Sequence, residues 1–196
     1  MVGSLLVLLA ACFAEPKAAP AAASVVPAPA TPSTAAATPT AGGVLAGLCE
    51  ASALVPWQGG WLVGDNEDKK RLHVYGPAFA PRGMLPLAAE VDDIEAIAWK
   101  DGAYQAVGSH STNKDGEPRP ARERIVTSDG RAFPVALDGC PACVAAKGTK
   151  PDAGGFNIEG AAWHGGTLWL GLRAPLAPNG AALLLALDDA GRVTRT

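Results

Sequence analysis

Three stretches decide the fold: EASALVPWQGGWLVG at residues 50–64, EAIAWKDGAYQAVG at residues 95–108 and EGAAWHGGTLWLG at residues 159–171. Each begins with a Glu, runs through small and apolar residues to a polar–Gly turn, and ends in an apolar, aromatic-bearing strand that closes on Gly. The turns at 58–60, 100–102 and 164–166 are the short Gly-containing connections that β-hairpins use. A unit that recurs in this way indicates a repeat architecture.

Two more short strands are expected after each hairpin, at 72–75 and 84–88, at 124–127 and 132–135, and at 182–187 and 192–194. Four antiparallel strands per unit are typical of a β-propeller blade. The sequence therefore predicts an all-β, β-propeller-like fold with three four-stranded blades, in which Trp61, Tyr104 and Trp169 occupy equivalent strand positions. A β-sandwich is the competing interpretation.

The spacing of the repeats predicts where the units begin and end. The step from Glu50 to Glu95 is that of one blade, and the longer step to Glu159 places an insertion rich in Gly, Pro and Cys at 138–155. Propellers usually have four to eight blades, so three blades do not close a ring. We therefore expect a truncated part of a larger propeller, with pairing of the open edges to another chain as the alternative.

The N-terminal region is predicted to direct export. Residues 2–11 form an apolar run that is too short for a membrane-spanning helix and ends in small residues, like a signal peptide. Residues 9–12, Leu-Ala-Ala-Cys, resemble the bacterial lipobox, which predicts lipidation at Cys12. No Lys or Arg precedes the run, so a chance Cys in an apolar leader is the alternative. Residues 1–12 are thus the expected signal peptide, 13–42 a disordered Pro/Ala/Thr linker, and 43–196 the blades.

Charge and export together limit the partners. With 16 Lys and Arg against 19 Asp and Glu, the net charge of -3 offers no basic surface for nucleic acid. The expected partners are a membrane, through the lipid anchor, and an unknown ligand or envelope protein. The expected location is the periplasmic or outer surface of a bacterial membrane.

Several motifs resemble the bacterial family catalogued as domain of unknown function 3616. They are VDDIEAIA at 91–98, GSHS at 108–111, ER at 123–124, FNIEG at 156–160 and GLRAP at 171–175. The resemblance covers roughly residues 49–187. The family in turn resembles, more remotely, the esterase-like phytase propellers. It implies a propeller with further blades and brings no established reaction. The chain departs from the motif at Ala96, where the family has the Gly seen at Gly160.

The repeated Glu residues are the first candidate site. Equivalent positions in a propeller lie at similar radius around one axis, so Glu50, Glu95 and Glu159 are expected to converge. Three carboxylates raise each other's pKa unless a cation lies among them, and oxygen ligands suit Ca²⁺. The alternative is that each Glu caps backbone N–H groups at the same corner of its blade.

The other end of each hairpin offers different chemistry in each unit. The equivalent positions that we expect to contribute to ligand binding are Asp65, Ser109 with His110, and Arg173. Asp65 is a possible cation ligand or part of a solvated turn. His110 is a possible general base with Ser109 or Ser111 as nucleophile, or a hydrogen-bonded loop residue. Arg173 is suited to bind an anion or to pair with one of the Glu residues.

Cys140 and Cys143 lie in the insertion and are predicted to form a disulfide in an exported protein. A thioredoxin-type centre needs a helix N-terminus, against which Gly148 and Pro151 argue. Pairing of Cys49 with one of the two is the alternative.

Three functions fit these features. The first is an exported propeller that binds an unknown ligand. The second is a metal-dependent hydrolase of phosphate or carboxylic esters, of the phytase-like propeller type. The third is a structural component of an envelope assembly.

Overall fold

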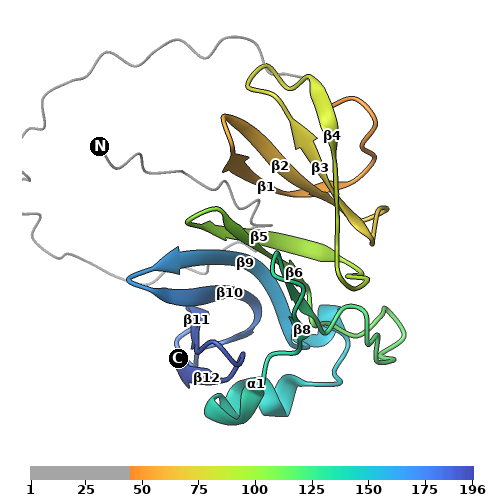
Figure 1. The fold of residues 1–196 in the computed structure, drawn as a ribbon. Helices are drawn as coiled ribbons and strands as arrows, with labels where there is room; N and C mark the ends of the chain where they lie inside the picture. The colour runs from red at the N-terminus through yellow and green to blue at the C-terminus, as the bar shows by residue number, and fades with distance from the viewer. Residues whose placement is uncertain (1–44) are drawn as a thin grey trace, which may run out of the picture. The chain divides into compact units, whose positions relative to one another are not determined.

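The computed structural model describes residues 45–196, which form three antiparallel four-stranded sheets (Figure 1). The first sheet contains β1 (Ala51–Trp57), β2 (Gly60–Asp65), β3 (Arg71–Tyr75) and β4 (Pro81–Pro86). The second contains β5 (Ile94–Lys100), β6 (Ala103–Gly108), β7 (Ile125–Thr127) and β8 (Ala132–Phe133). The third contains β9 (Asn157–His164), β10 (Thr167–Leu176), β11 (Ala182–Leu187) and β12 (Val193–Arg195). The predicted signal peptide with Cys12 and the whole of the predicted linker lie outside the described residues.

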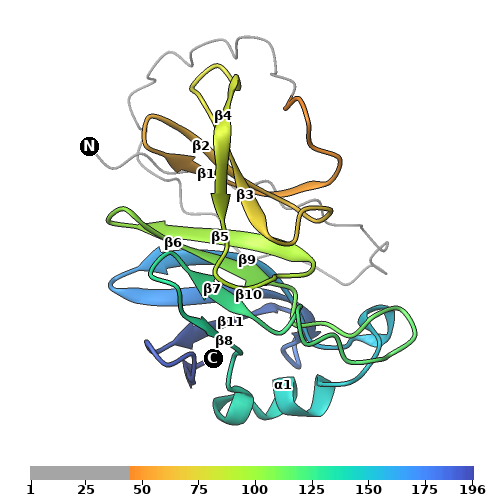
Figure 2. The same cartoon turned by 45° about the vertical axis from the view of Figure 1, so that its right-hand side comes forward.

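Within each sheet the strands follow one another in chain order, so each sheet is one blade-like meander. The first strands of the three sheets are neighbours: β5 contacts β1 on one side and β9 on the other (Figures 1 and 2). Blades that meet along their first strands are the arrangement of a propeller. The predicted β-propeller-like fold is confirmed, and the expected second pair of strands in each unit is present.

The three hairpin turns are alike in backbone conformation. Both central residues of each turn have positive φ, as a type I′ turn requires: Gln58 and Gly59 (44° and 72°), Asp101 and Gly102 (51° and 84°), Gly165 and Gly166 (57° and 79°). The twist of such a turn matches that of the strands it joins. The Gly-containing turns of the sequence therefore set the register of each hairpin.

The register corrects one prediction about the aromatic residues. Trp61 and Tyr104 are each the second residue after their turn and face Pro56 and Trp99. In the third sheet that position is Leu168, and Trp169 is one residue further along. The strands that carry Trp61, Tyr104 and Trp169 are equivalent, as predicted, since each is the second strand of its sheet. The predicted common register is wrong for Trp169, which is the third residue after its turn instead of the second.

The second sheet is buried on both faces, because the other two sheets pack against it. One apolar cluster joins it to the first sheet and includes Ile94 and Ile97. The other joins it to the third sheet and includes Ala96 and Ala98. Residues 94 and 96 of a regular strand would share a face. Ile94 and Ala96 instead lie in different clusters, so the bulge at Glu95 changes which face of the sheet the following side chains point to.

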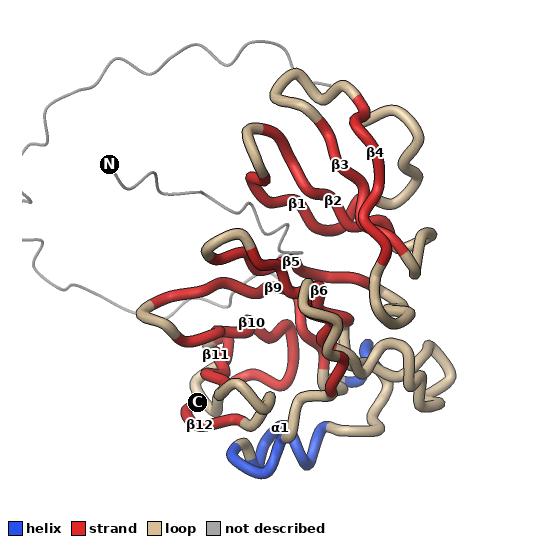
Figure 3. Tube along the Cα trace, in the orientation of Figure 1, coloured by secondary structure: helices blue, strands red, loops and turns tan. Residues whose placement is uncertain are grey.

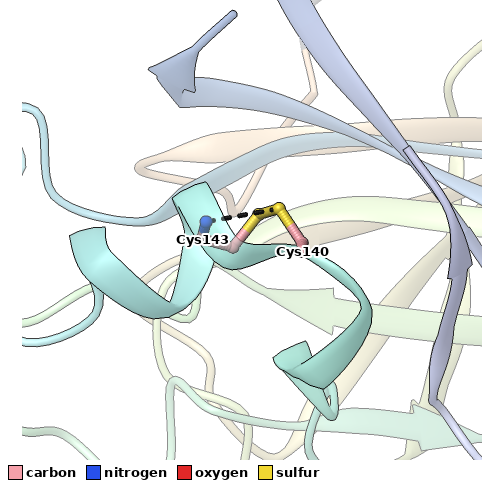
Figure 4. Close-up of a disulfide and its surroundings, with 2 residues drawn as sticks. All are labelled: Cys140 and Cys143. Carbon is pink, nitrogen blue, oxygen red and sulfur yellow. Dashed lines mark hydrogen bonds between the residues drawn. A yellow bond between two sulfur atoms is a disulfide. The ribbon is translucent and has the colours of Figure 1, made fainter.

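The described helices lie in the predicted insertion or begin one residue before it (Figure 3): η1 (Leu137–Gly139), α1 (Pro141–Ala146) and η2 (Pro151–Ala153). None of them is long and apolar enough to cross a membrane. Cys140 and Cys143 are disulfide-bonded at the start of α1 (Figure 4), as predicted. Both are buried in the cluster between the second and third sheets, whereas Cys49 is free and exposed.

The expectation that no helix begins at this motif is wrong. Pro141 occupies the first turn of α1, where its missing N–H costs nothing, and Cys140 caps that turn through its sulfur. Gly148, with φ of 83°, follows the end of the helix instead of preventing it. The insertion thus packs a short helix and its disulfide against the blades.

Candidate functional site

Each first strand contains a β-bulge, and the three bulged residues are equivalent. The pairing skips Ser52 between β1 and β2, Glu95 between β5 and β6, and Glu159 between β9 and β10. All three lie six residues before the first residue of the hairpin turn. A bulge leaves its extra residue outside the ladder and re-aims the side chain, which is why bulges are frequent next to functional sites.

Glu50 does not belong to this set. It lies eight residues before Gln58, is exposed, and donates its backbone N–H to Asp65 Oδ1 at 3.2 Å. Ser52 takes the position that Glu95 and Glu159 hold in the other sheets. The predicted equivalence of the three Glu residues is therefore wrong, because the first unit has two more residues between its Glu and its turn.

A second set of equivalent residues lies opposite the bulges, each directly after the residue that pairs with the one preceding the bulge. It comprises Asn66, Ser109 and Arg173, so the prediction of Asp65 at this position is one residue early. Ser52 Oγ donates to Asn66 Oδ1 at 3.0 Å in the first sheet. Arg173 Nη1 lies 3.5 Å from Glu159 Oε1 in the third. The two positions are thus paired in both outer sheets.

The second sheet breaks this pattern and leaves Glu95 unpaired. Ser109 Oγ lies 2.9 Å from Ser111 Oγ and also accepts the Ser111 N–H. Within residues 45–196, the half-buried Glu95 carboxyl makes no hydrogen bond or salt bridge. Burial, followed by the negative charges of Glu159 and Asp93, raises the pKa of Glu95 to about 8. At neutral pH Glu95 therefore holds a proton.

Other charged residues surround this carboxyl. Arg122 lies 3.1 Å from Asp93 and 3.3 Å from Asp92, and Asp92 also pairs with Lys69 at 2.7 Å. Arg122 and Arg173 oppose the rise in the pKa of Glu95 without reversing it. The cluster comprises four acidic residues, Asp92, Asp93, Glu95 and Glu159, and three basic ones, Lys69, Arg122 and Arg173. One negative charge is uncompensated, and the proton on Glu95 neutralises it.

Asn157 links the cluster to β9. Its side-chain Nδ2 donates to Glu159 Oε1 at 3.0 Å, which holds the Glu159 carboxylate between an amide and Arg173. Its Oδ1 is buried and has no hydrogen-bond donor among the described residues. A buried acceptor without a partner is uncommon in folded proteins and calls for a ligand or water.

Asp65 stabilises the chain locally. Its carboxylate accepts the backbone N–H groups of Cys49, Glu50 and Glu67 at 3.0 to 3.2 Å. Burial alone would raise its pKa, but these hydrogen bonds lower it below the ordinary value. The carboxylate thus ties the start of β1 to the end of β2.

His110 is a hydrogen-bonded loop residue, one of the two interpretations that the sequence leaves open. Its ring is buried: Nδ1 lies 2.9 Å from the Gly108 carbonyl oxygen, and Nε2 accepts the Val135 N–H at 3.2 Å. These contacts require the neutral tautomer with the proton on Nδ1. Burial lowers the pKa of His110 to about 4. Both nitrogens are engaged with the backbone, so neither is free to take a proton from Ser109 or Ser111.

The three predicted metal ligands do not gather. In the part of the chain that the structure describes, no three His, Cys, Asp or Glu side chains are placed to hold a metal ion together. The charge of Glu159 contributes to the raised pKa of Glu95, whereas Glu50 is exposed and is not among the charges that shift it. A site for Ca²⁺ at the two remaining carboxylates stays a prediction.

Comparisons with known proteins find similarity to solved structures. No protein-family model matches this chain, and no curated protein does. The crystal structure of Myxococcus xanthus glutaminyl cyclase is similar, with a TM-score of 0.46 and 19% sequence identity over 71% of this chain. The match covers 57% of that protein, so this chain spans little more than half of its length.

Sequence reasoning missed seven residues of the cluster and its surroundings: Ser52, Asn66, Lys69, Asp92, Asp93, Arg122 and Asn157. Ser52 and Asn66 can be found by counting from the Gly turns, which are the most reliable markers in the repeat. Asp93 precedes β5 and has a φ of 58°, a backbone conformation that no sequence motif here predicts. Arg122 comes from the long connection between β6 and β7, and only folding brings it to Asp92 and Asp93.

Proposed function

We propose that this chain is the propeller-like binding domain of an exported, membrane-anchored lipoprotein and that Glu95 and Glu159 bind a positively charged group of its ligand. One observation carries the binding site: two carboxylates occupy equivalent bulges on adjacent first strands, and one of them has no partner among the described residues. The export of the protein rests on the sequence of residues 2–12.

The charge of the cluster defines the ligand group. Its four acidic and three basic residues leave one negative charge, which a proton on Glu95 neutralises in the free protein. A primary ammonium group carries one positive charge and three N–H donors, so it can replace that proton and donate to both carboxylates. Ca²⁺ is the alternative cation, because it accepts carboxylate oxygens in irregular geometry.

The hydrolase and the envelope component are less well supported. His110 cannot act as the general base for Ser109 or Ser111, since both of its nitrogens are engaged with the backbone. No feature of the described blades favours an assembly role over ligand binding. Membership of the domain of unknown function 3616 family stays a prediction.

Thermal unfolding in the presence of cations tests the proposal. The probes are methylammonium chloride and CaCl₂, with tetramethylammonium chloride as a control that carries the same charge without N–H donors. We expect methylammonium or Ca²⁺ to raise the melting temperature of the full chain at matched ionic strength, because a ligand of the folded state stabilises it. Glu95→Gln should abolish the rise, and Glu50→Gln should leave it intact.

The control residue makes the outcome specific. Glu50 is exposed and is not among the charges that shift the pKa of Glu95, so Glu50→Gln makes the same chemical replacement outside the site. Equal stabilisation of wild type and Glu95→Gln by every salt would contradict the proposal, because it would show a general ionic effect. Stabilisation by neither methylammonium nor Ca²⁺ would also contradict it.

A further inference from the structure

The three sheets pack on one another in chain order, through opposite faces. The face of the first sheet that holds Ala53 packs on the face of the second sheet that holds Ile94 and Ile97. The opposite face of the second sheet, which holds Ala96, packs on the third sheet. We call the face toward the next sheet the leading face and the opposite one the trailing face. Both contacts between the described sheets therefore join a leading face to a trailing face.

Two faces lie at the ends of this series. Among the described residues, no sheet covers the trailing face of the first sheet or the leading face of the third (Figure 1). Both faces carry large apolar side chains that are exposed, Leu54 and Met84 on the first sheet and Leu184 on the third. Large exposed apolar surfaces mark sites of interaction with other proteins.

Part of the trailing face of the first sheet is covered by its own chain. The Tyr75 hydroxyl donates to the Ala46 carbonyl at 2.9 Å, so the segment before β1 lies over β3. The first strand stays open, since Ala51, Leu54 and Pro56 are exposed. The sheets of a propeller radiate from its axis, so neighbouring sheets approach most closely along their first strands. The open strand is thus the part that a neighbouring sheet contacts.

The leading face of the third sheet exposes a residue that its equivalent in the second sheet buries. Leu184 and Ile125 are equivalent, because each faces the fifth residue after its hairpin turn. Ile125 is 0% exposed and lies in the cluster between the second and third sheets. Leu184 is 54% exposed. The third sheet therefore presents the apolar surface of an internal blade contact without the sheet that would cover it.

The first strand of the third sheet is open in the same way. The residue after the bulge is small in all three sheets: Ala53, Ala96 and Gly160. Ala53 and Ala96 are buried beneath the next sheet. A Cβ atom added to Gly160 would meet no residue within 4 Å apart from its chain neighbours. The space that a neighbouring first strand fills in the other two sheets is therefore empty here.

The two internal contacts indicate which surface fits this space. In both, a leading face packs on the trailing face of another sheet of the same repeat. Within the described chain the open trailing face belongs to the first sheet, and the second sheet separates it from the third. We propose that two copies of this chain associate head to tail, so that the leading face of the third sheet of each copy packs on the trailing face of the first sheet of the other.

This pairing uses every open face of both copies. Each copy supplies one leading and one trailing face, so two copies related by a two-fold axis cover all of them and form a closed pair. Two copies of three sheets make six, which is within the four to eight blades of known propellers. Neither open face includes Glu95, so the pairing and the proposed cation site are tested separately.

Sedimentation equilibrium of the full chain over a series of concentrations tests the proposal. Cys12 and the exposed Cys49 are replaced by Ser in every sample, so that neither lipidation nor an intermolecular disulfide joins two copies. We expect association that stops at two chains, because the closed pair leaves no open face. A protein that stays monomeric up to its solubility limit would overturn the proposal and leave the face to a sheet of another protein. Growth beyond two chains would overturn the closed pair.

Charged variants on the two open faces locate the contact. Leu184→Glu and Leu54→Lys should each weaken association at least about a hundredfold, since each charge enters both contacts of the pair at about tenfold per contact. Val144→Glu is the matched control, because Val144 is 51% exposed but lies on α1. Ala162→Glu is a second variant on the leading face should Leu184→Glu fold poorly, since Ala162 is exposed and lies two residues after Gly160.

An equimolar mixture of Leu184→Glu and Leu54→Lys distinguishes the head-to-tail pair from other dimers. Ile125 and Ala161, their equivalents at the contact between the second and third sheets, belong to one packed cluster. A mixed pair therefore has one contact with opposite charges side by side and one unchanged contact. We expect the mixture to associate more tightly than either variant alone.

Two results with these variants would contradict the head-to-tail pair. Dimers that Leu184→Glu abolishes but Leu54→Lys leaves intact would show that two third sheets meet each other. Association that Val144→Glu weakens as much as Leu184→Glu does would show that it depends on general surface charge instead of the open faces.

Discussion

Replacing Glu95 by Gln is expected to stabilise the fold at neutral and alkaline pH. Burial and the charge of Glu159 raise the pKa of Glu95 from 4.5 to about 8, so the folded state binds the proton more tightly than the unfolded chain. The resulting stability is fully present below pH 4.5 and is lost as the pH rises through 8. Gln keeps the size of a protonated Glu and carries no charge at any pH.

The size of the effect follows from this shift. Each unit of pKa difference corresponds to about 1.4 kcal/mol. At pH 7 the ionisation of Glu95 therefore lowers the free energy of unfolding by at most about 3 kcal/mol, compared with a side chain that stays uncharged. Partial exposure of Glu95 and its coupling to Glu159 reduce this value. We expect Glu95→Gln to raise the free energy of unfolding by about 1 to 2 kcal/mol at pH 7, and by more at pH 8.5.

Urea denaturation between pH 5 and 9 measures this difference. The wild-type free energy of unfolding should fall across this range relative to that of Glu95→Gln, and the two proteins should converge near pH 5. Glu50→Gln is the control and should follow the wild type, because Glu50 is exposed. Parallel curves for wild type and Glu95→Gln would refute the reasoning, since they would show that Glu95 titrates alike in the folded and unfolded states.

Three further predictions concern other parts of the chain. Cys12→Ser should move the protein from the membrane to the soluble fraction of a bacterial host, and wild-type protein that is soluble and uncleaved would show that the lipobox interpretation is wrong. Asp65→Ala should lower the free energy of unfolding by about 2 kcal/mol in urea, because three backbone N–H groups lose their acceptor; an effect no larger than that of Glu67→Ala, at an exposed position, would argue against this role. Replacing both Cys140 and Cys143 by Ala should cost about 2 kcal/mol, the value expected for a short closed loop, and an unchanged melting temperature would mean that the disulfide does not constrain the unfolded chain.

The sequence predicts the hairpins well because their turns depend on local chemistry. Gly59, Gly102 and Gly166 each supply a positive φ that a type I′ turn requires, and this fixes which residues face each other. Alternating apolar residues then place the strands. The blade-like sheets could therefore be predicted from single segments of sequence.

The candidate site could be predicted only in part. Glu95 and Glu159 stand out as repeated residues, but the sequence pattern also includes Glu50, because the position of a bulge is not visible without the register. Arg122 joins the cluster from a long connection, so its position depends on contacts distant in sequence.

The central claim is that Glu95 and Glu159 form one coupled site on neighbouring bulges. NMR titration of the Glu95 side-chain carboxyl carbon tests it most directly, in the wild type and in Glu159→Gln. We predict a pKa near 8 for Glu95 in the wild type, a clearly lower pKa when Glu159 loses its charge, and no change in Glu50→Gln. An ordinary pKa near 4.5 in the wild type, or a pKa that Glu159→Gln leaves unchanged, would contradict the coupled site.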